Sequence, residues 1–278
     1  MIQDIAPHIY HNEYTPQDPV SESYILAYRE GEILMKKTDG QMMLPVFQEL
    51  EGRKTDLYET YIYLFSIDKD RFYLIPNLNT DLLPDYQFET IRTLREIRPR
   101  YLTFAGITGY QLYQWYQKRK FCGICGRPMV LGNTERMMYC PHCKNSEYPP
   151  LSPAVIVGIT HGDKLLLSKY EGRAHKRYAL IAGYAEIGET IEETVHREVM
   201  EEVGLKVKNL HYYKSQPWSF SGTLLFGFFC DLDGTDSITL DKHELALAQW
   251  FQREEIPDEG EDISLTKEMM MAFKNGLV

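Results

Sequence analysis

GYAEIGETIEETVHREVMEEVGL, residues 183–205, is the stretch that decides the fold of this chain, and most of it is predicted to form one helix. Ile191, Val195, Val199 and Val203 recur every four residues. This spacing predicts an apolar stripe that packs against a hydrophobic core. Most of the remaining positions are polar and rich in glutamate, so the helix is expected to be apolar on one face and acidic elsewhere.

Three glutamates are expected to share one edge of this helix. At about 100° per residue, Glu198 and Glu202 lie side by side next to the apolar stripe, with Glu201 close to them. Like charges four residues apart destabilise an isolated helix by about 0.2–0.5 kcal/mol per pair, which favours a cation between them. Carboxylate oxygens suit Mg²⁺ or Mn²⁺. The alternative is a solvated acidic face that binds no metal.

Composition limits the class of protein. The chain has 278 residues, 44% of them hydrophobic, which is enough for two domains with packed cores. A formal net charge of −10 argues against general attraction to nucleic acid or to an anionic membrane. Neither a signal-peptide pattern nor a run of about 18 apolar residues is present, so the protein is expected to be soluble, cytoplasmic and without membrane contact.

The chain is predicted to combine α+β and α/β architecture in three parts: an N-terminal α+β domain at residues 1–120, a ribbon at 121–147 and an α/β domain at 148–278. Short β-like runs fill the first part, followed by helical patterns at 88–97 and 109–119. In the last part, strands are expected near 164–168, 178–182, 207–213, 222–232 and 246–251, with a final helix at 265–274.

Four cysteines predict the ribbon. Cys122 and Cys125 form one C-x-x-C pair, and Cys140 and Cys143 form a second. Four thiolates at this spacing are typical of a structural Zn²⁺ site with no open position for catalysis. A ribbon that contacts nucleic acid and a redox role are the alternatives. Paired cysteines of this kind are typical of a reducing compartment.

Residues 183–205 also match a known motif position by position. The pattern G-x5-E-x7-R-E-U-x-E-E-x-G-U, with U aliphatic, is filled at every fixed place, and on this basis the chain resembles the Nudix hydrolases, whose catalytic domain is an α/β/α sandwich. The matching residues are Gly183, Glu189, Arg197, Glu198, Val199, Glu201, Glu202, Gly204 and Leu205.

A second stretch narrows the resemblance. The chain carries, in order, the zinc ribbon, the motif at residues 183–205, called the box below, and SQPWSFSGT at residues 215–223. This order resembles the NADH pyrophosphatase (NAD diphosphatase) family, whose marker is S-Q-P-W-P-F-P-x-S. Ser219 and Ser221 replace two prolines of the marker, and Thr223 replaces its last serine. The resemblance covers roughly residues 85–275.

The resemblance implies a role for particular residues. Glu198, Glu202, Glu244 and the backbone carbonyl of Ala182 are expected to bind Mg²⁺ or Mn²⁺. Glu198, Glu201 and Glu202 form the expected catalytic set, in which either Glu201 or Glu202 helps to activate water. Glu189 and Arg197 are expected to form an ion pair between loop and helix. The expected substrate-binding residues, on a loop after the box and elsewhere, are Glu135, Tyr148, Gln216, Pro217, Trp218, Ser219, Phe220, Ser221, Gly222, Thr223 and Thr266.

The implied activity is metal-dependent hydrolysis of the diphosphate in NADH or NAD⁺, which yields AMP and nicotinamide mononucleotide, and possible further removal of NAD caps from RNA 5′ ends. The first alternative is a Nudix hydrolase for ADP-ribose or another nucleoside diphosphate derivative. The second is a binding module that senses a nucleotide or RNA without cleaving it. A homodimer is the expected assembly.

Overall fold

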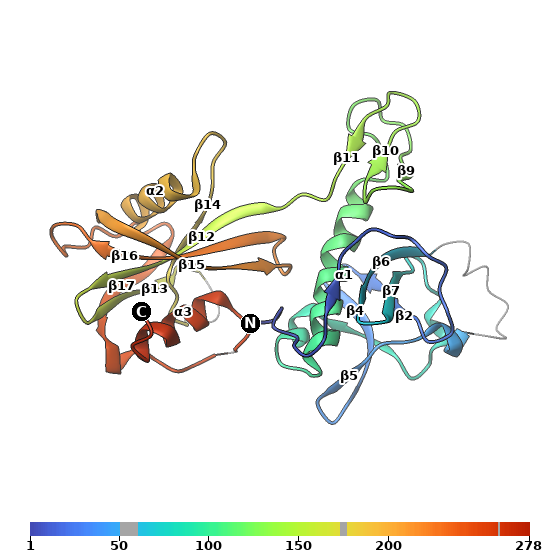
Figure 1. The fold of residues 1–278 in the computed structure, drawn as a ribbon, viewed down its shortest axis with the longest axis horizontal. Coiled ribbons are helices and arrows are strands. Elements are labelled where there is room, and N and C mark those ends of the chain that lie inside the picture. Colours follow the sequence, from blue (N-terminus) through green and yellow to red (C-terminus); the bar gives the residue numbers. More distant parts are fainter. Residues whose placement is uncertain (51–60, 173–176, 261) are drawn as a thin grey trace. The chain divides into compact units, whose positions relative to one another are not determined.

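The computed structural model describes residues 1–50, 61–172, 177–260 and 262–278 (Figure 1). The chain divides into two compact units. One contains residues 2–150 with the short segment 219–221, and the other contains residue 1, residues 151–218 and residues 222–278. The domain limits expected at 120/121 and 147/148 stay predictions.

The N-terminal unit contains two small sheets and one long helix. One sheet has the strand order β1-β6-β7-β2, and the other joins β3, β4 and β5 with β8 beside β4. Phe47 and Tyr73 are buried in a core that both sheets share. One of the β-like runs of the sequence covers residues 58–67; its residues 58–60 lie outside the described ranges, and β6 forms within the rest. The strands are β1 Tyr10–His11, β2 Tyr24–Leu26, β3 Tyr28–Arg29, β4 Glu32–Thr38, β5 Gln41–Met43, β6 Ile62–Ile67, β7 Asp70–Leu74 and β8 Gln87–Thr90.

Helical predictions in this unit need two corrections. Residues 88–97 were expected to be helical, but β8 pairs with β4 and only the short 3-10 helix Ile91–Arg95 follows. The helix expected at 109–119 is α1, Arg100–Lys118, which begins nine residues earlier. Gly109 lies inside this helix, where a larger residue would not fit: a Cβ there would lie 2.5 Å from side-chain atoms of Leu26 and Tyr28. The glycine therefore serves close packing and does not start the helix. Two further 3-10 helices are Phe47–Leu50 and Thr80–Leu82.

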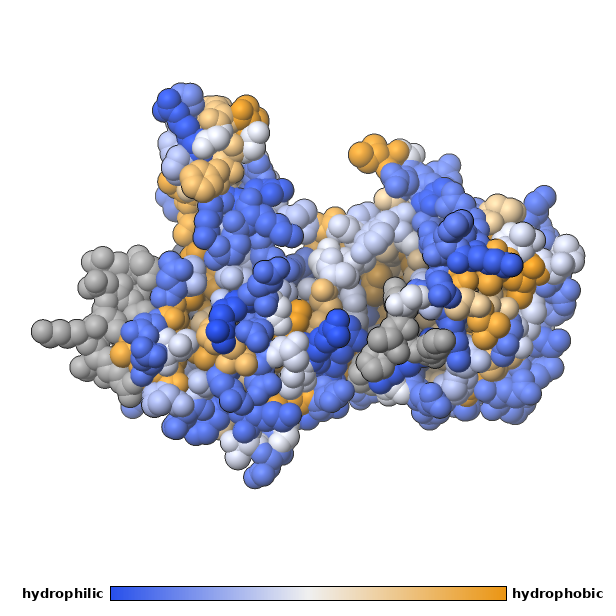
Figure 2. Space-filling view, turned by 180° about the vertical axis from the view of Figure 1, so that it is seen from behind, coloured by the Kyte–Doolittle hydropathy of each residue, from blue (hydrophilic) through white to orange (hydrophobic). Residues whose placement is uncertain are grey.

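The ribbon follows α1 and consists of three short antiparallel strands in the order β11-β10-β9, with β9 Val130–Leu131, β10 Met138–Tyr139 and β11 Ser146–Glu147. Hydrophobic residues gather on its surface in Figure 2. Its exposed large apolar residues include Phe121, Ile124, Val130 and Leu131. A segment this small buries too little apolar surface to be stable alone, so its folding depends on metal.

The C-terminal unit is built on a six-stranded sheet. Its order is β15-β16-β12-β13-β17, and β14 pairs with β12. Strands β12 and β16 run parallel, whereas the other pairs are antiparallel. The elements are β12 Ser152–His161, β13 Lys164–Tyr170, β14 Ile181–Tyr184, α2 Ile191–Val203, β15 Val207–Trp218, β16 Thr223–Leu232, β17 Leu245–Gln252, the 3-10 helix Arg253–Glu255 and α3 Leu265–Lys274.

Alternate residues of β12 separate two cores. Val155 and Val157 pack with α2, whereas Ile156 between them packs with α3. Successive side chains of a strand point to opposite faces, so the two helices cover opposite sides of the sheet, as Figure 1 shows. The expected α/β/α sandwich and the α+β character of the N-terminal unit are confirmed. In the described part of the chain, no helix is long and apolar enough to span a membrane.

Candidate functional site

Helix α2 starts and ends at clear capping residues. The Thr190 side chain accepts a hydrogen bond from the Glu193 backbone N–H, and the Glu193 carboxylate accepts one from the Thr190 N–H. This capping box satisfies two of the backbone donors that the first turn of a helix leaves unpaired. Gly204 closes the helix in the left-handed conformation, with φ 66°. The helical part of residues 183–205 therefore begins only after a loop of six residues.

The apolar stripe fixes how α2 is oriented on the sheet. Val195, Val199 and Val203 are fully buried against Val155 and Val157 of β12. This contact turns the neighbouring edge of the helix toward β14. The predicted apolar stripe therefore determines where Glu198, Glu201 and Glu202 lie.

Two of the three glutamates are buried. Glu198 is 8% exposed and Glu202 is 1% exposed, whereas Glu201 is exposed to solvent. The carboxylate of Glu198 lies directly against the backbone of Gly183 in β14, where a Cβ would overlap it. Burial raises the pKa of Glu198, and the nearby Arg197 guanidinium opposes this effect. The helix thus carries an inner pair of carboxylates and one outer carboxylate.

Arg197 joins the loop to the helix. Its guanidinium donates two hydrogen bonds to Glu189, at 2.5 and 2.9 Å, one to Glu198 at 2.7 Å and one to Glu201 at 2.9 Å. It also donates to the Tyr184 backbone carbonyl at 2.9 Å. These bonds lower the pKa of Glu189 to about 2. The expected Glu189–Arg197 ion pair is present, and Arg197 supplies the positive charge beside Glu198 and Glu201.

Glu202 is left without such a partner. Among the residues that the structure describes, neither of its buried carboxylate oxygens has a hydrogen-bond partner. Burial raises its pKa to about 8, the charges of Glu198 and Glu244 add to this, and the Ala182 backbone amide acts weakly in the opposite direction. Buried charged groups are normally paired or bind metals. A divalent cation such as Mg²⁺ or Mn²⁺ therefore fits the donor set around Glu202.

The other expected metal ligands lie around this pair. Ala182 is on β14, one residue before Gly183, and its register partner is Ile156 of β12. Glu244 is exposed in the turn before β17, and its charge raises the pKa values of both Glu198 and Glu202. Across the described ranges, the four ribbon cysteines are the one group of three or more ligand side chains that already converges. The carboxylates are near one another but are not arranged as a complete ligand set.

Asp241 is a residue near this site that the sequence analysis missed. Its backbone N–H donates to the Glu202 carbonyl at 2.9 Å, and its charge contributes to the raised pKa of Glu202. An aspartate three residues before Glu244 is a sequence signal, but only the fold brings it to the end of α2.

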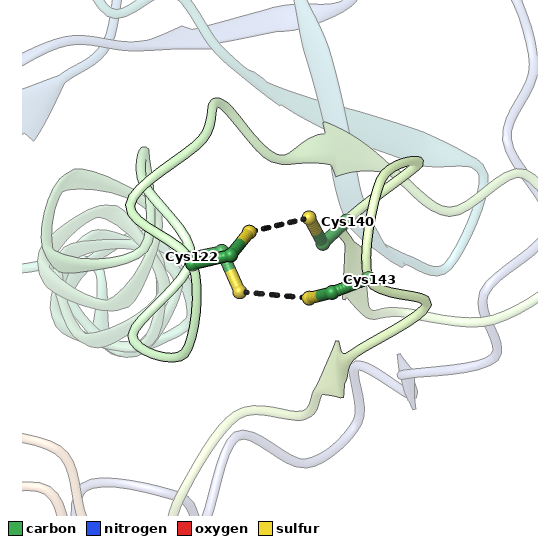
Figure 3. A group of neighbouring side chains, drawn as sticks. Cys122, Cys140 and Cys143 are labelled. Carbon is green, nitrogen blue, oxygen red and sulfur yellow. Dashed lines mark hydrogen bonds between the residues drawn. The ribbon is translucent and has the colours of Figure 1, made fainter.

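The four ribbon cysteines converge at one point (Figure 3). Their Sγ atoms all lie within 4.8 Å of one another, with Cys122 and Cys143 3.5 Å apart and Cys125 and Cys140 also 3.5 Å apart. Disulfide bonds require sulfurs about 2.05 Å apart. Tetrahedral Zn–S bonds of about 2.3 Å place sulfurs about 3.8 Å apart. The cluster fits a closed, structural Zn²⁺ site.

The expected substrate residues fall into several places. Tyr148 donates a hydrogen bond to Glu135 at 2.9 Å, so the structure brings these two ribbon residues together. Thr266 is in the first turn of α3. Gln216 is fully buried, and its amide donates to the Ile263 carbonyl at 2.8 Å and accepts from the Leu265 N–H at 2.7 Å. These two bonds tie β15 to the start of α3.

The stretch expected to be a substrate loop is in fact mostly the end of a hairpin. Strand β15 continues through Gln216, Pro217 and Trp218, whereas it was expected to end near residue 213. Trp218 pairs with Thr223, the first residue of β16. Only four residues connect the two strands: Ser219, Phe220, Ser221 and Gly222. Thr223 is buried, and its hydroxyl lies 3.3 Å from that of Tyr184.

Comparison with known families matches both parts of the site. The family model of the NUDIX domain matches residues 150–272, and that of the NADH pyrophosphatase zinc ribbon domain matches residues 118–148.

Two curated relatives carry the name NAD-capped RNA hydrolase NudC. The chain is 40% identical to the one from Klebsiella pneumoniae (strain 342), over 60% of this chain and 65% of the relative. It is 43% identical to the one from Salmonella schwarzengrund (strain CVM19633), over 54% of this chain and 58% of the relative. The matches span less than two thirds of the length of each relative.

Among solved structures, a NUDIX hydrolase from Nitrosomonas europaea aligns with a TM-score of 0.48 and 22% identity, over 56% of this chain and 91% of that one.

Proposed function

Because the chain belongs to the Nudix hydrolases, in the NADH pyrophosphatase family with a zinc ribbon, we propose that it is a metal-dependent hydrolase of the diphosphate in NADH and NAD⁺. The products are AMP and the reduced or oxidised nicotinamide mononucleotide. One water molecule is consumed for each bond broken, and each product keeps one phosphate.

One observation carries this proposal. Glu202 is a buried carboxylate that has no hydrogen-bond partner in the described ranges, and the negative charges of Glu198 and Glu244 act on it. A carboxyl with a purely structural role in this position would need a partner, because burial without one disfavours its charged form and raises its pKa. A divalent cation bound beside Glu202 would supply the missing partner.

In this mechanism, Mg²⁺ or Mn²⁺ would be held by Glu198, Glu202, Glu244 and the carbonyl of Ala182. Such an ion neutralises negative charge on the diphosphate oxygens. Arg197 keeps Glu198 in place through its bond at 2.7 Å. Glu201 or Glu202 would accept the proton of the attacking water. Catalysis then rests on positioning and on electrostatic stabilisation of the developing charge.

We assign substrate recognition to the residues that the resemblance selects. The aromatic rings of Tyr148 and Phe220 are suited to stacking on a base or a nicotinamide ring, an interaction of about 1–3 kcal/mol per base in nucleic-acid sites. Tyr148 is exposed and keeps its hydroxyl on Glu135. The other proposed contacts are Gln216, Pro217, Trp218, Ser219, Ser221, Gly222, Thr223 and Thr266.

Removal of NAD caps from RNA is a second proposed activity, favoured by the similarity to relatives named NAD-capped RNA hydrolases. The same diphosphate bond is broken in a free dinucleotide and in a capped 5′ end. With a net charge of −10, the chain is not suited to general RNA binding. Recognition is therefore expected to centre on the cap.

A substrate panel tests the proposal. NADH, NAD⁺, ADP-ribose, diadenosine polyphosphates and NAD-capped RNA are incubated with zinc-loaded protein and Mg²⁺ or Mn²⁺, and the products are identified by mass spectrometry. The proposal expects AMP and nicotinamide mononucleotide from NADH. Preferred cleavage of ADP-ribose would support the alternative hydrolase, and binding without turnover of any compound would support a sensor.

Assembly and location are proposed on separate grounds. A homodimer is proposed from the family resemblance, and light scattering coupled to gel filtration measures it. A cytoplasmic location is proposed because the ribbon cysteines bind zinc as free thiolates, which persist in a reducing compartment.

A further inference from the structure

The segment after β16 passes along the C-terminal end of α2. Thr239 donates its backbone N–H to the Val203 carbonyl at 2.9 Å, and Asp241 donates to the Glu202 carbonyl at 2.9 Å. The last four carbonyls of a helix have no partner within the helix and must be satisfied from outside. These two bonds therefore fix the segment to the turn of α2 that carries Glu202.

Asp241 also organises the turn that carries Glu244. Its side-chain Oδ1 accepts a hydrogen bond from the His243 N–H at 2.8 Å. Its backbone carbonyl accepts from Leu245 at 2.9 Å and, more weakly, from Glu244 at 3.3 Å. Aspartate and asparagine favour turns of this kind because their side chains bind the backbone two residues further on.

The other side of this turn is held as well. The Glu244 carbonyl accepts a hydrogen bond at 2.9 Å from the backbone N–H of Glu171, which directly follows β13. Glu202 and Glu244 are thus connected through one residue, Asp241, whose backbone binds α2 and whose side chain shapes the turn. The Glu244 side chain itself is exposed.

We propose that Asp241 is a positioning residue, whose side-chain bond to the His243 N–H sets Glu244 at the correct distance from Glu202 to bind a divalent cation. This proposal rests on the proposed function, because it takes Glu244 to be a metal ligand. For this positioning, Asp241 needs its Oδ1 acceptor and not its charge. Asparagine should therefore replace it, and glutamate should not, because its longer side chain moves the acceptor away from the amide.

The test compares Asp241→Asn with Asp241→Glu, using Glu244→Gln as the reference for loss of the ligand. Mn²⁺ affinity of the zinc-loaded protein is measured by isothermal titration calorimetry, and the KM for NADH is measured at saturating Mn²⁺. Asp241→Asn should stay within about 3-fold of the wild type in Mn²⁺ affinity. Asp241→Glu should lose about 10–100-fold, the range typical of residues that orient a metal ligand. The KM for NADH should change less than 3-fold in both.

Asp236→Ala is the matched control. Asp236 is an exposed acid of the same segment, and its backbone carbonyl accepts a hydrogen bond from the Trp250 side chain at 3.3 Å. Its loss removes one negative charge and should leave Mn²⁺ affinity unchanged. Circular dichroism and thermal melting of each variant separate loss of affinity from loss of folding.

Three outcomes overturn the inference. If Asp241→Asn loses as much affinity as Asp241→Glu, the charge of Asp241 is what matters. Wild-type affinity in Asp241→Glu would show that the turn needs no such bond. If Glu244→Gln binds Mn²⁺ like the wild type, Glu244 is not a ligand, which contradicts that part of the proposed function and removes the basis for this inference.

Discussion

The carboxylate of Glu198 lies against the backbone of Gly183, so closely that this position has no room for a Cβ atom. Gly183 is on strand β14 of the sheet and Glu198 is on helix α2, which packs against that strand. Arg197 holds the other side of the carboxylate through a bond at 2.7 Å. A glycine at the first box position is therefore required by the space that Glu198 occupies.

Substitution of Gly183 by alanine should damage catalysis more than folding. The added methyl group overlaps the end of a flexible side chain, so Glu198 can rotate away while the backbone stays in place. NADH hydrolysis should fall about 10–100-fold, as it does when the orientation of a ligand is lost. The free energy of unfolding should change by about 1 kcal/mol or less.

A double-mutant cycle provides the control for this prediction. If Gly183→Ala acts through Glu198, it should reduce activity little further in a Glu198→Gln background. Equal losses in both backgrounds would show that the methyl group disturbs something other than Glu198.

The ion pair of Glu189 and Arg197 should make stability depend on pH in the acid range. Arg197 lowers the pKa of Glu189 from 4.5 to about 2. A lowered folded-state pKa means that the carboxylate stabilises the fold above about pH 4.5, and that this contribution disappears as the pH falls toward 2. Glu189→Gln should therefore lower the Tm at pH 7, and the difference from the wild type should shrink at pH 3.

Thermal melts of the two proteins at both pH values measure this effect. Glu192→Gln, which changes an exposed glutamate in the first turn of α2, controls for the loss of one charge. A Tm difference that stays constant from pH 7 to pH 3 would contradict the assignment.

Glu202 should have the opposite effect in protein that lacks the divalent cation. Its pKa is raised from 4.5 to about 8, so the folded state keeps a proton that the unfolded state loses. This carboxyl therefore destabilises the fold progressively from about pH 4.5 to pH 8, with a limiting slope of about 1.4 kcal/mol per pH unit. Glu202→Gln should raise the Tm at pH 8 and change it little at pH 4.5.

The melts are made with zinc-loaded protein in buffer free of Mg²⁺ and Mn²⁺, without a chelator that would remove zinc. Glu201→Gln, which removes the exposed glutamate next to it, should not reproduce the gain at pH 8. An unchanged Tm for Glu202→Gln at pH 8 would mean that the Glu202 carboxyl does not destabilise the fold at this pH, which contradicts its raised pKa.

Gln216 should contribute to stability through its two buried hydrogen bonds. Gln216→Leu leaves the Ile263 carbonyl and the Leu265 N–H unpaired, and each such group costs about 1–3 kcal/mol. Urea unfolding should show a loss of about 2–5 kcal/mol in total. Lys214→Ala is the matched control, because it breaks the ion pair with Glu268 between the same strand and helix at a more exposed position. That pair is worth about 1 kcal/mol or less, and equal losses would contradict the role of Gln216.

Helical periodicity predicted the part of the site that lies within one element. The spacing of the valines predicted which face of α2 carries the apolar stripe. The positions of Glu198 and Glu202 beside that stripe followed from it. It did not separate the buried pair from the exposed Glu201, because burial depends on where β14 lies. The extra bonds of Arg197 to Glu201 and the Tyr184 carbonyl also require the folded loop.

Local composition was misleading where strand pairing decides the structure. Pro217 and its serine neighbours are typical of loops. Pro217 belongs to β15 because pairing with β16 extends to Trp218, and β15 is an edge strand, where a missing N–H is tolerated. Ser219 and Ser221 lie in the connection that follows. Asp241 was missed for a similar reason, since its contact with Glu202 joins segments that are separate in the sequence.

The most direct test of the central claim is the release of AMP from NADH by wild-type protein and by Glu202→Gln, at saturating Mg²⁺ and with both proteins loaded with zinc. The account predicts that the wild type releases AMP and reduced nicotinamide mononucleotide in equal amounts. It predicts that Glu202→Gln, with its fold intact by circular dichroism, is slower by at least about 100-fold. No release of AMP by the wild type, or near wild-type release by Glu202→Gln, would contradict it.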